Sequence, residues 1–159
     1  MKIFNCSKYY VWEHRKEIFD EPKNVVISIN DLGNSFTNFQ PELPPFEPEY
    51  NDRALILHFS DSTPDSINQK DLFDVIHANQ ILDYAEKAFK EGKNLVVHCN
   101  MGVCRSSAVS LNLNDYINRI LSDNEEDFSD NIINGFEKRP SPNPHVSSIM
   151  RTEIEKRIK

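Results

Sequence analysis

The sequence predicts an α/β fold in which a central, mostly parallel sheet carries helices on both faces. Two observations predict this fold: short apolar runs alternate with longer helical patterns, and turn-forming residues separate the two kinds of segment. At 159 residues the chain fits a single domain spanning residues 1–159. A chain of this length buries about two-thirds of its unfolded surface, so it needs no disulfide or metal to hold its core together.

Three apolar runs are predicted to be buried strands of this sheet. They are Val25–Ile29, Ala54–Phe59 and Asn94–Val97. Ile3 and Phe4 are expected to open a further strand at an edge of the sheet. Residues 34–52 hold four prolines and are predicted to form a surface loop within the domain, not a linker between domains.

Three segments carry the apolar periodicity of amphipathic helices. Apolar residues recur at three- and four-residue steps from residue 76 to 91, and Gly92 suits the C-terminal cap of that helix. A second helix is predicted to begin near Arg105 and to extend to Leu121. A third is predicted over residues 145–158, after a proline-rich break, and acidic residues 123–127 are interpreted as a solvated bend.

The composition argues against several classes of protein. A net charge of −7 and a pI near 5.2 do not provide the broad basic field that non-specific nucleic-acid binding requires. No apolar run approaches the roughly 18 residues of a membrane span, and the first ten residues lack the features of a signal peptide. Three cysteines, an odd number, do not form a disulfide framework. We therefore expect a cytoplasmic protein with free thiols and without nucleic-acid or membrane partners.

The strongest chemical signal lies in residues 96–107. A buried strand ends in His98 and Cys99, five residues follow, and Arg105 and Ser106 then open a helix. Attack on phosphorus requires a thiolate, and the inward-pointing N–H groups of a tight loop and a helix N-terminus stabilise an anion. The same amides can hold phosphate oxygens, while the planar guanidinium of Arg105 offers two parallel hydrogen bonds. This pattern predicts a phosphate-binding loop with Cys99 as nucleophile.

Other positions of this loop have expected roles. Gly102 permits a positive φ and keeps side chains out of the tight turn. Ser106 is placed to donate a hydrogen bond to the sulfur of Cys99, which helps the sulfur to leave in a second step. His98 is expected to orient the loop through its ring nitrogens and not to react. The phosphate is expected to contact Asn100, Met101, Gly102, Val103, Cys104 and Arg105.

The order His-Cys, five residues, Arg-Ser is similar to the signature of the protein tyrosine phosphatase superfamily, and the chain resembles its small dual-specificity-like members. The resemblance covers about residues 25–150 and includes the segments 57–61 and 139–144. It implies a phosphatase-like fold and hydrolysis of phosphate monoesters on proteins through a phosphocysteine intermediate, with no cofactor and no metal. Phosphotyrosine is the expected substrate group, and phosphoserine and phosphothreonine remain open. The chain lacks the phosphotyrosine-clamping and glutamine-bearing loops of the longer relatives.

The leaving oxygen needs a proton, which usually comes from a carboxylic acid on a loop. Asp61, which follows the strand ending at Phe59, is the first candidate for this general acid. Asp65 is its rival and Asp52 a third alternative. An aspartate in such a Ser/Thr/Pro-containing loop also commonly caps a turn, so the assignment stays open at this point.

Some residues keep two interpretations. Cys104 either traps an oxidised Cys99 as a disulfide or packs as a small side chain. The resemblance implies that Asn143 braces the cysteine loop, and a simple turn is the alternative. Four aromatic residues either line the mouth of the site or pack into the core: Tyr9, Tyr10, Trp12 and Phe19. The histidines outside the loop show no metal-ligand spacing.

Alternative functions remain for the same loop. A non-catalytic phosphopeptide-binding module would keep Arg105 and lose the nucleophile or the acid. A phosphatase acting on a non-protein phosphate, such as a phosphoinositide or an RNA 5′ end, is a further alternative. Phosphoinositide enzymes are expected to carry basic loop residues, and this loop is neutral between Cys99 and Arg105. A rhodanese-type sulfurtransferase usually has a shorter loop. The oligomeric state is left open.

Overall fold

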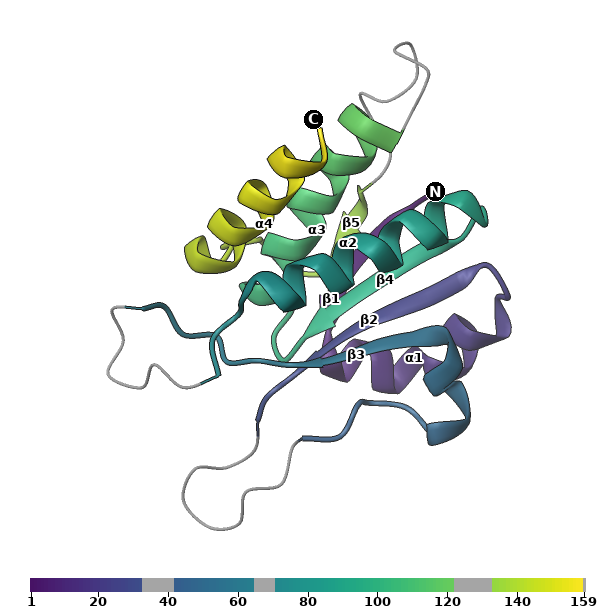
Figure 1. The fold of residues 1–159 in the computed structure, drawn as a ribbon. Coiled ribbons are helices and arrows are strands. Elements are labelled where there is room, and N and C mark those ends of the chain that lie inside the picture. The colour runs from purple at the N-terminus through teal and green to yellow at the C-terminus, as the bar shows by residue number, and fades with distance from the viewer. Residues whose placement is uncertain (33–41, 65–70, 122–132, 159) are drawn as a thin grey trace.

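A computed structural model of the chain describes residues 1–32, 42–64, 71–121 and 133–158 (Figure 1). Five strands form one sheet in the order β3-β2-β4-β1-β5, and every paired neighbour is parallel. The strands are β1 (Ile3–Ser7), β2 (Asn24–Asn30), β3 (Ala54–His58), β4 (Asn94–Cys99) and β5 (Ile133–Phe136). The parallel sheet and the three predicted strands are therefore confirmed. The predicted burial is wrong for β3, which lies at an edge of the sheet and buries only Leu57.

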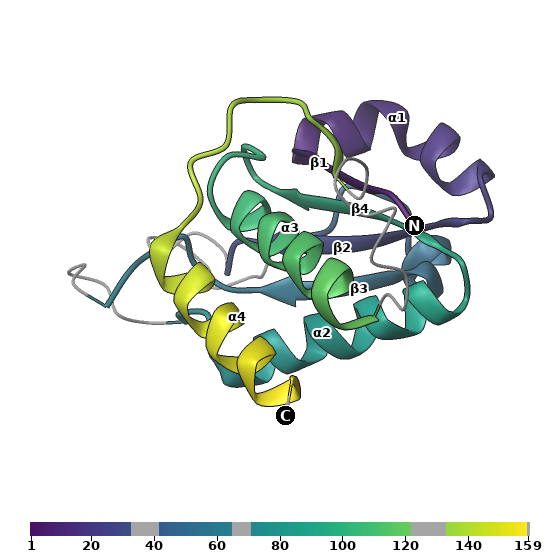
Figure 2. The same cartoon turned by 90° about the horizontal axis from the view of Figure 1, so that it is seen from above.

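Helices cover both faces of the sheet, as predicted. One face carries α1 (Lys8–Asp20), and the other carries α2 (Val75–Lys90), α3 (Arg105–Tyr116) and α4 (Pro144–Arg157) (Figures 1 and 2). After Tyr116 the helix continues as a π-helical turn, Ile117–Leu121, so the predicted helix is present but changes its winding. Within the described part of the chain, no helix combines the length and the apolar character that a membrane span requires.

The N-terminal region differs from its prediction. β1 is not an edge strand, because β5 pairs along its outer side and β4 along its inner side. The sequence analysis did not predict α1. This helix buries only a narrow apolar stripe and exposes Tyr9 and Trp12, so its apolar residues do not show a clear helical period. The helix begins where the hydroxyl of Ser7 accepts a hydrogen bond from the backbone N–H of Tyr10.

The predicted surface loop over residues 34–52 needs correction where it is described. Residues 42–52 include most of a 3₁₀ helix, Pro48–Arg53, and the side chain of Phe46 is buried. Phe46 and Tyr50 both pack on Phe19 of α1, with ring centroids 5.1 and 4.3 Å apart. Proline did not prevent this segment from burying aromatic rings against α1. The acidic bend predicted at residues 123–127 lies outside the described residues.

Two apolar clusters hold the layers together. Along β4, Leu95 and Val97 face a large cluster formed with α2, α3 and α4, whereas Val96 faces a smaller cluster formed with α1. This alternation follows from the two-residue period of a strand. Because all strands are parallel, the segments that follow β1, β2, β3 and β4 gather at one edge of the sheet, where ligands of such folds bind.

Candidate active site

The predicted nucleophile lies at the carboxyl end of β4, directly before the loop that leads into α3. Cys99 is buried, and its sulfur accepts a hydrogen bond from the hydroxyl of Ser106 at 3.2 Å. Ser106 belongs to the first turn of α3, which begins at Arg105. The structure thus brings Cys99, Arg105 and Ser106 together as the sequence predicted.

The turn of the loop is shaped by β1 and the start of α1. Gly102 has a φ of +72°, and a Cβ at this position would lie 2.6 Å from the backbone carbonyl carbon of Cys6. The side-chain amide of Asn5 donates to the carbonyl of Gly102 at 2.8 Å, and the N–H of Lys8 donates to the carbonyl of Asn100 at 3.1 Å. Only glycine fits at residue 102, both for conformation and for space.

The other side of the loop rests on the segment before α4. The N–H of Ser141 donates to the carbonyl of Val103 at 2.9 Å, and that of Asn143 to the carbonyl of Cys104 at 3.1 Å. The side-chain oxygen of Asn143 caps α4, while its side-chain nitrogen donates to Asp61 at 2.9 Å. One asparagine therefore joins the cysteine loop, the start of α4 and the candidate acid.

His98 is held in a buried chain of hydrogen bonds. Its Nδ1 donates to the carbonyl of Cys99 at 3.2 Å, so in the neutral ring Nε2 accepts from the hydroxyl of Ser28 at 2.6 Å. Asn30 in turn donates to that hydroxyl at 3.0 Å. Complete burial, reinforced by nearby Lys8 and Arg105, lowers the pKa of His98 to about 4. His98 is therefore neutral at physiological pH and fixes the backbone at the nucleophile.

This lowered pKa predicts a pH-dependent loss of stability. His98 binds a proton near pH 6.5 when unfolded but only near pH 4 when folded, so acid favours the unfolded chain. Between about pH 7 and pH 5, we expect His98 to remove about 2 kcal/mol from the free energy of unfolding. Urea unfolding of the wild type and of His98→Gln measures this difference. Equal pH dependence in both proteins would contradict a neutral buried His98.

Arg105 is anchored on one edge of its guanidinium and unpaired on another. Its terminal nitrogen NH1 donates to the carbonyl of Phe59 at 2.8 Å and lies 2.6 Å from a carboxylate oxygen of Asp31. The side chain is only 4% exposed, and Nε is buried without a hydrogen-bond partner among the described residues. A buried unpaired donor is costly, which makes this edge ready for a bound anion.

Asp31 is a site residue that the sequence analysis missed. One carboxylate oxygen contacts Arg105, and the other accepts from the side-chain amide of Asn100 at 3.1 Å. Asp31 thus connects the two ends of the cysteine loop. Its position directly after β2 could have indicated a site residue, because β2 pairs with β4 and both strands end at the same edge of the sheet.

We predict that Asp31→Asn lowers kcat/KM for a small aryl phosphate about tenfold. The substitution removes the charge that holds NH1, and a half-exposed ion pair of this kind contributes on the order of 1 kcal/mol. Asp52→Asn, which removes an equal charge outside the cysteine loop, is the matched control. A rise in kcat/KM in Asp31→Asn would show instead that Asp31 competes with phosphate for Arg105.

The three candidate acids differ in what the structure says of them. Asp61 is exposed and follows β3, and the contact between Arg105 and Phe59 brings this segment against the cysteine loop. Asp52 precedes β3 and lies at the opposite, amino edge of the sheet, so it is wrong as a general acid. Asp65 lies outside the described residues.

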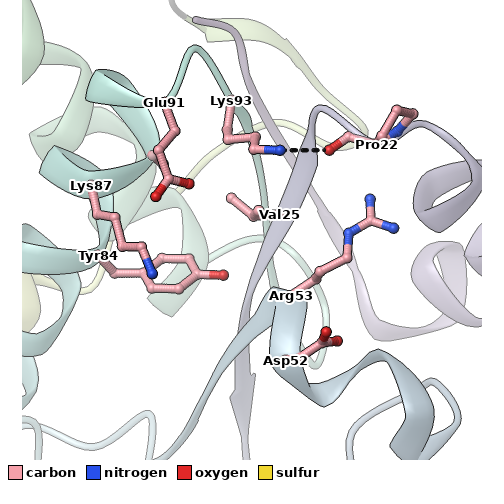
Figure 3. A pocket seen from close by; sticks show the side chains of 9 residues that line it. Pro22, Val25, Asp52, Arg53, Tyr84, Lys87, Glu91 and Lys93 are labelled. Carbon is pink, nitrogen blue, oxygen red and sulfur yellow. Dashed lines mark hydrogen bonds between the residues drawn. The ribbon is translucent and has the colours of Figure 1, made fainter.

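The cavity in which Asp52 lies does not resemble a catalytic site. Its volume is about 250 Å³, and its lining includes Arg53, Tyr84, Lys87 and Lys93 (Figure 3). Arg53 already donates to the carbonyls of Glu21 and Asn24 at 2.7 and 2.9 Å. Lys93 donates to the carbonyl of Pro22 at 3.0 Å, so these two cations support the backbone.

All three cysteines are free thiols. Burial raises the pKa of Cys104, and nearby Asp61 raises it further. Cys104 is therefore protonated at neutral pH, which slows any attack on an oxidised Cys99 because the thiolate is the attacking species. The disulfide between Cys99 and Cys104 stays a hypothesis, and the protonated thiol of Cys104 limits the rate at which it could form.

Comparison with known proteins identifies the fold. No family model and no curated protein matches the sequence. Among solved structures, the human tyrosine phosphatase-like serine/threonine/tyrosine-interacting protein is similar over 99% of this chain and 93% of its own, with a TM-score of 0.59 and 14% identity. The chain has a tyrosine phosphatase fold. A structure named Tk-PTP in the active form matches over the same shares, with a TM-score of 0.48 and 19% identity.

The tyrosine phosphatase fold confirms the resemblance at the level of architecture. The human protein is named as phosphatase-like and as interacting, not as a phosphatase. The fold by itself therefore does not separate an enzyme from a binding module, and that question depends on the chemistry of the cysteine loop.

Proposed function

We propose that this protein is a cysteine-dependent phosphatase that hydrolyses phosphate monoesters on proteins. One observation carries the proposal: the sulfur of Cys99, hydrogen-bonded by Ser106, begins a tight loop whose other end presents a buried Arg105 with an unpaired Nε. A nucleophile and an anion-binding donor at the two ends of one loop suit attack on a phosphoryl group.

The reaction runs in two steps. The thiolate of Cys99 attacks phosphorus, so a P–S bond forms while the P–O ester bond breaks, and Asp61 gives its proton to the leaving oxygen. The Asp61 carboxylate then takes a proton from water, whose oxygen attacks phosphorus and breaks the P–S bond. The hydroxyl of Ser106 stabilises the thiolate that leaves. Arg105 and the amides of residues 100–105 neutralise charge on the phosphoryl oxygens in both steps.

Asp61 is the proposed acid because Asn143 orients its carboxyl group beside the loop. We predict that Asp61→Asn slows hydrolysis of esters with poor leaving groups by about a hundredfold, since only these need the proton. It should also flatten the basic limb of the pH profile of kcat. A series of aryl phosphates with increasing leaving-group pKa measures both effects.

Asp65→Asn is the comparison that separates the two acids. If only the Asp65 variant acquires a steep dependence on the leaving group, Asp65 is the acid and the role of Asp61 is to accept a hydrogen bond from Asn143. Asn143→Ala should show a weaker form of the Asp61 effect, because it removes the donor that orients the carboxyl group.

Phosphorylated proteins or peptides are the proposed substrates, with phosphotyrosine first. The loop between Cys99 and Arg105 holds no basic residue, which does not favour a phosphoinositide. A non-catalytic phosphopeptide-binding module is the second candidate, favoured by the name of the human structural relative. The three free thiols suit the reducing cytoplasm, which we propose as the compartment.

An assay of wild-type protein in the presence of a chelator tests the proposal. We expect hydrolysis of p-nitrophenyl phosphate and of phosphotyrosine peptides without added metal. Binding of the same phosphopeptides with no release of phosphate would favour the binding module. Loss of all turnover on adding the chelator would contradict the proposed mechanism.

A further inference from the structure

A recessed surface adjoins the cysteine loop on the side of α1. It is lined by Lys8, Tyr9, Trp12, Pro44, Pro45 and Asn100, and its volume is about 450 Å³. We call it the α1 groove. Two aromatic side chains and two prolines make most of its lining apolar, and Asn100, the first loop residue after Cys99, forms part of its wall.

Exposed apolar side chains concentrate around this groove. The described residues include eight large apolar side chains that are exposed, and four of them belong to the groove or follow or precede its residues in the chain. These four are Tyr9 (69% exposed), Trp12 (46%), Leu43 (77%) and Met101 (59%). Exposed apolar groups that gather in one place, in contrast to scattered ones, indicate a binding surface.

The groove and the cysteine loop are parts of one continuous surface. The N–H of Lys8 donates to the carbonyl of Asn100, and Ser7, which precedes Lys8, pairs with Cys99 in the sheet. An extended peptide advances about 3.3 Å per residue, so a phosphorylated residue seated at Cys99 leaves its close neighbours in sequence within reach of the groove. The occupant that fits this position is therefore a segment of the substrate itself.

The charged side chains beside the groove are paired with one another. The ammonium of Lys8 is already engaged by Glu42 and by the carbonyl of Leu43, each at 2.7 Å. Asp31 lies against the side chain of Asn100. Asp31 is itself paired with Arg105 at 2.6 Å. The guanidinium of Arg15 lies 3.8 Å from the centroid of the Trp12 ring and is paired with Glu47 at 2.8 Å. The open surface of the groove is therefore left to aromatic rings and prolines, which favour apolar side chains.

We propose that the α1 groove binds an apolar side chain close in sequence to the phosphorylated residue of a protein substrate. The inference rests on the proposed phosphatase function and gives it a sequence preference. Tyr9 and Trp12 are one helical turn apart on α1 and form the apolar contact, while Pro44 and Pro45 form the facing wall.

Two matched phosphotyrosine peptides test the preference, one with leucine and one with aspartate in the two positions on each side of the phosphotyrosine. We expect the wild type to hydrolyse the leucine peptide with a KM about tenfold lower. Trp12→Ala and Tyr9→Ala should remove most of this difference and leave kcat for p-nitrophenyl phosphate as in the wild type. Ile158→Ala, which truncates another exposed apolar residue on the opposite face of the sheet, is the control and should keep the preference.

A binding measurement gives a readout independent of turnover. Trp12 is the only tryptophan of the chain, so its fluorescence reports on the groove directly. In Cys99→Ser, the leucine peptide should change the emission of Trp12, and inorganic phosphate alone should not.

The outcomes separate this inference from the proposed function. If p-nitrophenyl phosphate is hydrolysed but both peptides have equal KM values, the groove is not a substrate site and the phosphatase function stands. If no ester is hydrolysed but the leucine peptide still changes Trp12 fluorescence, the groove stands and the phosphatase function is wrong. If Trp12→Ala lowers kcat/KM for p-nitrophenyl phosphate and for the leucine peptide by the same factor, the groove is not a substrate site. The substitution would then act through the cysteine loop.

Discussion

Replacing Cys99 with serine is expected to abolish hydrolysis of p-nitrophenyl phosphate, with a loss of roughly a thousandfold or more in kcat. A serine hydroxyl is a far weaker nucleophile at neutral pH than a thiolate. His98 cannot activate it as a base, because its Nδ1–H donates to a carbonyl and its Nε2 accepts from Ser28. Burst and steady-state release of p-nitrophenol measure the effect.

Binding of phosphate should survive in the same variant. The contacts that shape the loop involve the backbone of residues 100–104, the side chain of Asn5 and the backbone N–H of Asn143, none of which the substitution touches. Isothermal titration with inorganic phosphate or vanadate checks this expectation. Cys6→Ala removes another buried thiol, on the α1 side of the sheet, and controls for loss of packing. Undiminished turnover in Cys99→Ser would show that the protein does not use this nucleophile.

The part of the candidate site whose arrangement could be predicted from the sequence is the part that is contiguous in the chain. A strand, a five-residue loop and a helix start are encoded within residues 94–107, and their spacing alone brings Cys99, Arg105 and Ser106 together. Their positions depend on local backbone geometry, which local sequence determines. Asn143 was also recovered, but through the resemblance and not through its spacing.

The residues that support the loop could not be found in this way. Asn5, Asp31 and the carbonyl of Phe59 reach the loop because β1 and β2 flank β4, β3 lies next to β2, and all these parallel strands end at the same edge of the sheet. Strand order is a non-local property, and the sequence analysis had placed β1 at an edge of the sheet. With β1 at an edge, nothing would have indicated that Asn5 holds Gly102.

The aromatic residues of α1 show the same limit on a smaller scale. The sequence analysis did not decide whether four of them line the mouth of the site or pack into the core. The structure assigns two to each group. Tyr10 stacks on His14 with centroids 4.1 Å apart and Phe19 packs against Tyr50, whereas Tyr9 and Trp12 are exposed beside Asn100. Without a predicted helix, the side chains that share a face could not be separated.

Arg105→Lys is expected to lower kcat/KM for aryl phosphates by roughly a hundredfold or more, although the charge is kept. The guanidinium has two tasks in this structure. NH1 is held by Asp31 and by the carbonyl of Phe59, and the buried Nε edge remains for phosphate. A lysine has one ammonium group, so it either binds the anchors or reaches the phosphate, and it cannot form the bidentate contact.

The measurement separates this loss from a general effect of shortening a buried arginine. Arg53→Lys is the matched control, because Arg53 also donates to backbone carbonyls but at the amino edge of the sheet. Both variants should unfold at a lower temperature than the wild type, and only Arg105→Lys should also weaken inhibition by vanadate. Because Asp31 anchors NH1, adding Asp31→Asn to Arg105→Lys should cost little beyond the single substitution. An Arg105→Lys variant with wild-type kcat and vanadate affinity would show that the phosphate is held by the loop amides alone.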